Sequence, residues 1–235
     1  MSAMKPLTRH ALAELMGTFA LVFTGCGAIV INQVSNGAIT HPGIALTFGF
    51  IVLALIYALG DISGAHLNPA VTLNFWLAGR FERHKLLPYI LAQTAGALLA
   101  CLLLRFLFPT NSTLGATLPA GSAMQSFVLE LVMTWLLMLV ILNVSTGAKE
   151  KGITAGIAVG SAIALEAMFG GPISGASMNP ARSLGPALIS GNLQHLWVYL
   201  LAPTLGGALA VLSCRVIHEP GCCTSCTAAK GTPTT

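Results

Sequence analysis

Two asparagines occupy the same place in two copies of one twelve-residue segment. Residues 62–73 read ISGAHLNPAVTL and residues 173–184 read ISGASMNPARSL, with eight identical positions. In each copy an Asn-Pro pair, with Asn68 or Asn179 as its first member, precedes a short apolar run. Asparagine is a strong helix N-cap and proline is favoured at the first helical position. The repeat therefore predicts two short helices that begin at the two prolines.

The chemistry that these sites offer is hydrogen-bond donation. An N-cap asparagine accepts backbone hydrogen bonds with its side-chain oxygen, which leaves its NH2 group as a donor. Each helix N-terminus adds roughly half a positive charge. Two such ends facing one lumen would repel cations, and a water that accepts from Asn68 and Asn179 would turn its hydrogens outward. The pair thus predicts a pore that passes neutral molecules and excludes ions and protons.

Composition indicates what surrounds these short helices. The chain has 235 residues, of which 55% are hydrophobic and only 8% are charged. A soluble domain carries about 25% charged residues, so the solvent for most of this chain must be a lipid bilayer. The formal net charge of +4 is therefore no sign of a nucleic-acid partner.

Six apolar runs are long enough to cross a bilayer, which takes about 17 to 25 residues. The expected spans are residues 11–31, 42–59, 86–108, 124–144, 153–169 and 196–217. Two further apolar runs, residues 69–77 and 180–189, are too short to cross and fit re-entrant half-helices. The sequence predicts an all-α membrane protein with six transmembrane helices and two half-helices. Glu14 in the first run favours a retained span over a cleaved signal peptide.

Basic residues indicate which side holds the termini. Six spans place both termini on one side, and if that side is cytoplasmic it receives nine of the eleven Lys and Arg residues. Positive charge concentrates on the cytoplasmic side of membrane proteins. We therefore expect an integral, multi-pass protein of a plasma (bacterial inner) membrane with cytoplasmic N- and C-termini. The outer loops, residues 32–40 and 109–121, are polar but almost uncharged.

The twelve-residue repeat belongs to a longer one. Glu14 in the first span matches Glu130 in the fourth, and the halves are about residues 5–108 and 122–218. Each half holds three spans, an odd number, so the second half lies upside down relative to the first. Proteins built from such inverted repeats place their pathway near the membrane midplane.

These features resemble the aquaporin (major intrinsic protein) family over about residues 8–218. The resemblance rests on two Asn-Pro-Ala motifs, Arg182 directly after the second, a Ser-Gly-Ala-His segment before the first, and a glutamate in each half's first span. The second motif's surroundings are most similar to the plant nodulin-like intrinsic proteins and their bacterial relatives. The resemblance implies the family's right-handed helical bundle, a homotetramer with one pore in each subunit, and passive transport without any cofactor.

The family has a second constriction on the outer side, and by spacing from the motifs its four positions fall on Phe48, Ala167, Ala176 and Arg182. A strict water channel usually has His where Ala167 stands and often Cys where Ala176 stands. Two alanines imply a wider, more apolar opening, although Ser183 is the water-channel residue where glycerol facilitators usually carry Asp. We expect passage of water and small uncharged solutes such as glycerol, with urea, ammonia or undissociated metalloid acids as further candidates. The alternative is a strictly water-selective aquaporin.

Residues around the two motifs are expected to line or support the pore. The motifs themselves are Asn68, Pro69, Ala70, Asn179, Pro180 and Ala181. The segments before them should be extended and should line the pore through Gly64, Ala65, His66, Gly175 and Ser177, since irregular backbone at this depth faces protein or water. The alternative for His66 is a contact within a cytoplasmic loop.

Four buried charges have two interpretations each. Arg182 is expected to face the pore, with a structural ion pair as the alternative. Glu14 and Glu130 are expected to accept hydrogen bonds from the backbone that leads to each half-helix, with a proton relay as the alternative. Glu166 adjoins Ala167 but points about 100° away on a helix, so we expect it to support the outer loop, with pH sensing as the alternative.

The chain ends are expected to lie outside the channel domain. Residues 1–7 form a cytoplasmic N-terminus, residues 8–218 the channel domain, and residues 219–235 a disordered, cysteine-containing cytoplasmic tail. The tail thiols Cys222, Cys223 and Cys226 are weak candidates for soft-metal binding or acylation, and a tail without a role is the favoured interpretation.

Other classes of function fit less well. An enzyme would need a base paired with a nucleophile, whereas the motifs offer amides, an arginine and backbone. An ion-coupled secondary transporter shares inverted repeats and broken helices but needs a titratable or cation-binding cluster at the midplane. A scaffolding membrane protein gives no reason for two pore-directed asparagines.

Overall fold

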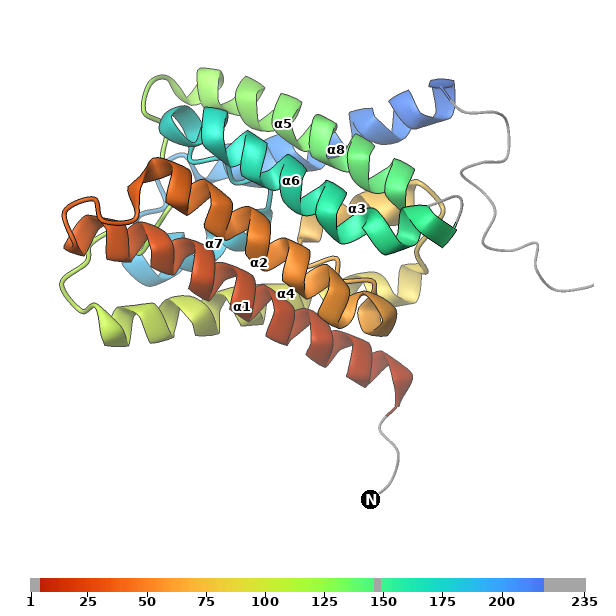
Figure 1. Ribbon diagram of the computed structural model, residues 1–235, viewed down its shortest axis with the longest axis horizontal. Helices are drawn as coiled ribbons and strands as arrows, with labels where there is room; N and C mark the ends of the chain where they lie inside the picture. The colour runs from red at the N-terminus through yellow and green to blue at the C-terminus, as the bar shows by residue number, and fades with distance from the viewer. Residues whose placement is uncertain (1–4, 146–148, 218–235) are drawn as a thin grey trace, which may run out of the picture.

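The computed structural model describes residues 5–145 and 149–217, and this part of the chain is built from eight α-helices without a strand (Figure 1). The helices are α1 (Pro6–Val34), α2 (Thr40–Ser63), α3 (Pro69–Leu77), α4 (Arg83–Leu107), α5 (Ala123–Val144), α6 (Lys149–Ser174), α7 (Pro180–Ser190) and α8 (Leu196–Ile217). The tail cysteines Cys222, Cys223 and Cys226 lie outside the described residues.

The prediction of six spans and two half-helices is confirmed. Six helices are long and apolar enough to cross a membrane, and α3 and α7 are the two short ones. The largest differences in length are in α1, which begins at Pro6 rather than near residue 11, and in α6, which ends at Ser174 rather than near residue 169. Proline at a first helical position fits a helix start, and backbone hydrogen bonding carries the helix through the polar residues that precede the apolar run.

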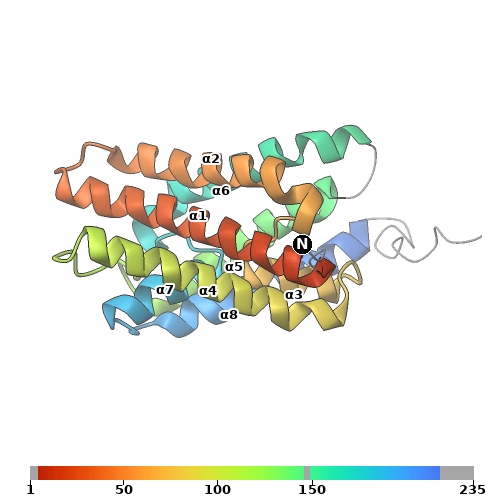
Figure 2. The ribbon, with the colours of Figure 1, turned by 90° about the horizontal axis from the view of Figure 1, so that it is seen from below.

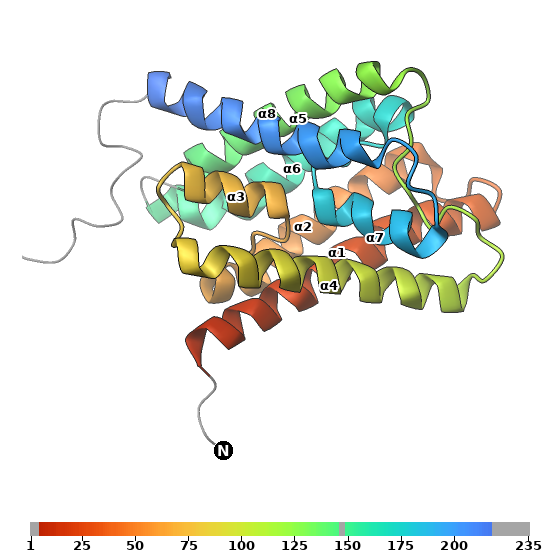
Figure 3. The same cartoon turned by 180° about the vertical axis from the view of Figure 1, so that it is seen from behind.

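The helices pack as two related halves, α1–α4 and α5–α8. The most extensive contacts join α1 with α4, α5 with α8, and α2 with α6. The first two pairs are equivalent under the repeat, whereas α2 and α6 are equivalent to each other and meet across the bundle. The long helices run along one common direction (Figure 2), and α3 and α7 lie end to end between α4 and α8 (Figure 3).

Both described ends of the chain lie at one end of the bundle. The start of α1 and the end of α8 are on the same side in Figure 1. We call this side the terminal end and the other side the opposite end. Both ends lie on one side because six helices, an even number, would cross the membrane.

Glycines allow the equivalent pairs to pack closely. A Cβ atom on Gly96 of α4 would collide with the carbonyl oxygen of Leu15 on α1. A Cβ on Gly206 of α8 would collide in the same way with the carbonyl oxygen of Leu131 on α5. Small residues at helix contacts let backbones approach, which is a general device of membrane bundles. The same contact made twice is direct structural evidence for the repeat.

We predict that Gly206→Ala destabilises the bundle. The added methyl group overlaps the backbone of α5, and such overpacking costs about 1–3 kcal/mol. The control is Gly60→Ala on α2, where an added Cβ meets no atom within 4 Å. Thermal unfolding in detergent should show a lower midpoint for Gly206→Ala only, and equal midpoints would contradict the proposed close contact.

Candidate pore

The two half-helices begin at the Asn-Pro pairs. The side-chain oxygen of Asn68 accepts hydrogen bonds from the backbone N–H groups of Ala70 (2.8 Å) and Val71 (3.4 Å). Asn179 accepts in the same way from the second and third residues after it, at 3.0 and 3.3 Å. Each helix has proline at its first position. The N-terminal positive ends of α3 and α7 therefore lie at the two asparagines.

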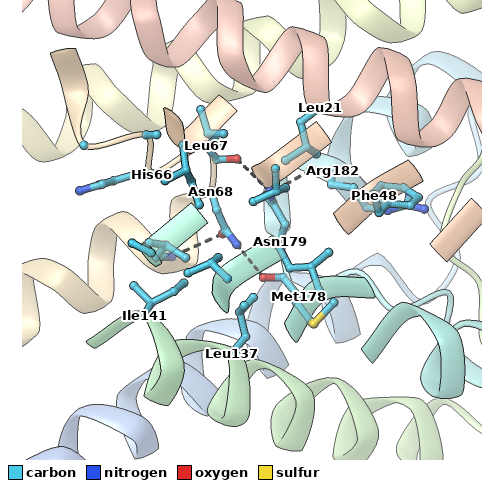
Figure 4. Close-up of a pocket in the computed structure, with 18 of the residues that line it drawn as sticks. Leu21, Phe48, His66, Leu67, Asn68, Leu137, Ile141, Met178, Asn179 and Arg182 are labelled. Atoms are coloured by element: carbon cyan, nitrogen blue, oxygen red, sulfur yellow. Dashed lines mark hydrogen bonds between the residues drawn. The ribbon is translucent and has the colours of Figure 1, made fainter. Parts of the chain in front are cut away.

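The two asparagine amides tie the halves together. Asn68 Nδ2 donates to the carbonyl oxygen of Met178 at 2.8 Å, and Asn179 Nδ2 donates to the carbonyl oxygen of Leu67 at 2.9 Å (Figure 4). The sequence predicts that both N–H groups of each amide face the lumen. One N–H of each instead bridges to the other half, so one remains to face the cavity that both side chains line.

The segments before the motifs are not extended, contrary to expectation. Ser63 and Ser174 still end helices, and three of the four residues that follow each serine have a positive φ angle. The φ angles are +46° at Ala65, +53° at Leu67, +41° at Ala176 and +52° at Met178. Non-glycine residues rarely adopt this conformation. Turns of this kind bring successive N–H groups toward one side and form a concave anion site, which is the physical reason for the irregular backbone.

A buried glutamate fills the anion site in each half. Glu14 accepts from the backbone N–H groups of His66 (2.9 Å) and Leu67 (2.7 Å) and from the side chains of Ser63 and Gln93. It is 0% exposed. Its carboxyl group is thus surrounded by donors from the segment that leads into α3.

Glu130 makes the equivalent set of contacts in the second half. It accepts from the N–H groups of Ser177 and Met178, both at 2.8 Å, and from Ser174 Oγ at 2.7 Å. It is also 0% exposed. Neither Glu130 nor Glu14 is among the residues that line the cavity. Both carboxyl groups therefore face backbone donors, as expected of residues that hold the segments before the half-helices in place.

A cavity of about 130 Å³ runs along the bundle between two unlike walls. A water needs about 10–15 Å³ of such space, so the cavity has room for a file of them. One wall comes from the irregular segments and their asparagines. The other wall is apolar and is formed by residues of α1, α2, α5 and α6: Leu21, Val52, Ile56, Leu137, Ile141, Val159 and Ile163.

Most of the expected pore residues do line this cavity. Gly64, Ala65, His66 and Ser177 are among its lining residues, together with both asparagines. Gly175 is not, because it packs against Thr117, whose Cγ2 would lie 3.0 Å from a Cβ there. The prolines and alanines of the motifs lie behind the asparagines, in the first turns of the half-helices: Pro69, Ala70, Pro180 and Ala181.

The four expected filter residues, Phe48, Ala167, Ala176 and Arg182, all line the cavity. The guanidinium carbon of Arg182 lies 5.1 Å from the centre of the Phe48 ring. Arg182 is 1% exposed, and its Nη1 donates to the carbonyl oxygen of Gly115 at 2.8 Å. Among the described residues its Nε and Nη2 have no hydrogen-bond partner, and no carboxylate lies within ion-pair distance of it.

Known proteins match this chain over nearly its whole length. Residues 1–213 match the family described as major intrinsic protein. The chain belongs to the major intrinsic protein family. It is therefore an integral, multi-pass membrane channel, and its relatives are aquaporin channels, which are not enzymes.

Relatives of this family member are found among plant channels. Aquaporin NIP1-1 of Zea mays is 48% identical over 219 residues, which cover 92% of this chain and 78% of that protein. Nodulin-26 of Glycine max is 45% identical, with 86% of this chain and 74% of that protein covered. The crystal structure of the aquaglyceroporin from Plasmodium falciparum superposes with a TM-score of 0.79 at 26% identity, covering 88% of this chain and 94% of that one.

This member of the major intrinsic protein family also has a buried row of hydrogen-bonded hydroxyl groups that the sequence does not predict. Ser183 Oγ lies 2.7 Å from Thr117 Oγ1 and 2.6 Å from Ser177 Oγ, and Ser177 Oγ donates to the carbonyl oxygen of Asn179. Thr117 belongs to the segment between the repeat halves, for which the sequence predicts only an outer loop. Because this segment lies outside both halves, comparing the halves gives no signal for it.

His66 lines the cavity and packs in a cluster of aromatic rings. Its Nδ1 lies 3.1 Å from Thr72 Oγ1, and its ring packs against Phe75, Phe81 and Tyr89 at centroid distances of 4.7, 4.8 and 5.3 Å. These contacts fix the ring on the cavity side. Phe81 lies between α3 and α4, so the ring also contacts the loop that joins these two helices.

Glu166 has a different environment from the two supporting glutamates. It is 4% exposed and is not among the cavity-lining residues. Its Oε2 has no hydrogen-bond partner in the described part of the chain. That oxygen therefore makes no bond to the outer loop that it was expected to support.

We predict that Glu130→Gln destabilises the channel. An amide offers one acceptor where the carboxylate offers two, so a buried N–H at Ser177 or Met178 loses its partner at a cost of about 1–3 kcal/mol. Both the unfolding midpoint in detergent and the water permeability in proteoliposomes should fall.

The control is Glu166→Gln, which has the same change of shape and charge on α6. Since Glu166 Oε2 has no partner, this variant should keep the wild-type midpoint or raise it. Equal losses in the two variants would argue against a supporting role specific to Glu130.

Proposed function

We propose that this protein is a passive channel for water and small uncharged solutes that excludes ions and protons. One observation carries the proposal: two asparagine amides, each at the N-terminus of a half-helix, line the same continuous cavity. Opposite them the wall is apolar. A permeating molecule can therefore accept hydrogen bonds from one side only, which orients it without holding it.

Exclusion of cations follows from the charges around this pathway. Two half-helix N-termini contribute partial positive charge at the asparagines, and Arg182 contributes a full charge at the filter level. The carboxyl groups of Glu14 and Glu130 do not line the cavity. An ion-coupled transporter would need cation ligands here, so the arrangement supports a channel.

The filter residues support a solute larger than water. Ala167 and Ala176 present only methyl groups beside Phe48 and Arg182, which leaves space and an apolar surface next to a cationic donor. Glycerol has carbon on one side and hydroxyl groups on the other and fits such a site. A relative of known structure is entitled an aquaglyceroporin, and plant relatives are named aquaporins. Urea, ammonia and undissociated metalloid acids are further candidates of the same size class.

We further propose a cytoplasmic terminal end and a homotetramer with one pore in each subunit, with residues 8–218 as the channel unit. Arg105 lies at the far end of α4, whereas five basic residues belong to the start of α1, the α3–α4 connection with the start of α4, or the end of α8, all at the terminal end: Arg9, Arg80, Arg83, Lys85 and Arg215. The positive-inside rule makes this the cytoplasmic side of a plasma membrane. The expectation of a bacterial inner membrane gains no support from the named relatives, which come from plants.

Wild-type proteoliposomes should conduct water and glycerol but not sorbitol. In stopped-flow light scattering, vesicles under a sorbitol gradient should shrink rapidly and stay shrunken. Under an equal glycerol gradient they should shrink rapidly and then re-swell as glycerol enters. An uncoupler and changes in ion gradients should leave these rates unchanged, because a passive channel has no coupling ion. Exclusion of glycerol equal to that of sorbitol would contradict the wide filter and favour the strictly water-selective alternative.

Ala167→His should make the filter narrower and more polar. We expect glycerol permeability to fall by about tenfold, an added barrier of about 1.4 kcal/mol, while water permeability falls much less. Ala167→Val is the companion variant, since it adds bulk without a polar group. If both variants leave the glycerol-to-water ratio at its wild-type value, Ala167 does not form the filter.

A further inference from the structure

The segment between the repeat halves enters the interior of the protein. Leu114 is fully buried and Thr117 nearly so, although both lie between α4 and α5 rather than in a helix. The φ angle is +51° at Leu114 and +73° at Gly115. Asn111 Oδ1 accepts from the N–H of Leu114 at 2.8 Å and shapes the turn. The backbone is thereby presented to the filter.

The carbonyl oxygen of Gly115 accepts from two directions. Arg182 Nη1 donates to it at 2.8 Å from α7, and Cys26 Sγ donates to it at 3.8 Å from α1. A thiol is a weak donor, so its bond alone gives little energy. The bond also shows that Gly115 packs directly against α1.

That packing leaves no space for a side chain at residue 115. A Cβ there would lie 2.9 Å from both Cα and Cβ of Cys26 and 3.0 Å from its carbonyl oxygen. The φ angle at this position is +73°, which residues other than glycine rarely adopt. Gly115 therefore rests on the backbone of α1, and α1 fixes where its carbonyl oxygen lies.

Arg182 depends on this carbonyl for its position. Nη1 has its partner there, whereas Nε and Nη2 are buried and have none among the described residues. The equivalent residue of the first half is Val71, so the repeat supplies no second arginine and no second support.

We propose that Cys26 and Gly115 are positioning residues that set the location of the Arg182 guanidinium and through it the ratio of solute to water passage. The inference rests on the proposed function, because it assigns Arg182 to the filter. An arginine released from Gly115 extends toward water in the lumen. This narrows the pathway and hinders glycerol more than water.

The test compares Gly115→Ala with Gly79→Ala in proteoliposomes. Gly79 has a similar φ angle of +75° but an added Cβ there meets no atom within 4 Å, so it controls for backbone strain. Gly115→Ala should lower the glycerol-to-water permeability ratio by about threefold or more, the effect of losing about one hydrogen bond, while Gly79→Ala keeps the ratio. A fall in both permeabilities by one common factor would mean fewer folded channels and would overturn the proposal.

A second pair of variants covers the case in which Gly115→Ala does not fold. Cys26→Ala keeps the backbone and Cβ of residue 26 but removes the Sγ atom that donates to the Gly115 carbonyl oxygen, and it should lower the same ratio by about twofold, within the range of a weak hydrogen bond. Cys214→Ala removes an equally buried thiol from α8, in a separate apolar cluster, and should not change it. Equal ratios for the two cysteine variants would overturn the proposal.

The outcomes also separate this proposal from the proposed function. Wild-type protein that passes water but not glycerol contradicts the proposed solute range, whatever the variants do. In that case water permeability per folded channel becomes the readout. It should fall by about threefold for Gly115→Ala relative to Gly79→Ala if Arg182 moves into the lumen.

Discussion

Irregular backbone inside a membrane must have every polar group paired, and two buried carboxyl groups meet this requirement. A half-helix that stops at the midplane needs a segment of chain to bring it there, and that segment has no helical hydrogen bonds. Glu14 and Glu130 each collect two of its N–H groups on a rigid spanning helix. The left-handed residues Leu67 and Met178 are held by these bonds. Their carbonyl oxygens then receive the asparagine amides of the other half.

The polar groups around the two glutamates find different hydrogen-bond partners in the two halves, and the difference has a structural reason. In the first half, Gln93 of α4 donates to both Glu14 and Thr72 and closes the network. The equivalent residue of α8 is Pro203, which has no side-chain donor. In the second half the hydroxyl of Thr117, from the segment between the halves, contacts Ser183 instead. That segment thus completes the second half, and it is also the segment that contacts Arg182.

Repetition is what made much of this architecture predictable. Six apolar runs and two copies of one motif predict the spans and the half-helices, because hydropathy and N-cap chemistry act locally. Asn68 and Asn179 start helices for reasons contained within three residues of each. The left-handed backbone at Ala65 and Ala176 could not be predicted in this way. It follows from a carboxyl group more than forty positions away in the sequence, and nothing in the local residues indicates it.

Gly115 shows the same limit more sharply. In the sequence it is one glycine in a polar loop, and neither half of the repeat contains its counterpart. Its role becomes visible only when α1, α7 and the loop are placed together, since its carbonyl oxygen lies between Cys26 and Arg182. Inversion gives both halves the same way of ending a helix at the midplane. A filter with one arginine on one side requires an element that the inversion does not duplicate. The segment between the halves is such an element, because it occurs once and reaches one end of the pathway.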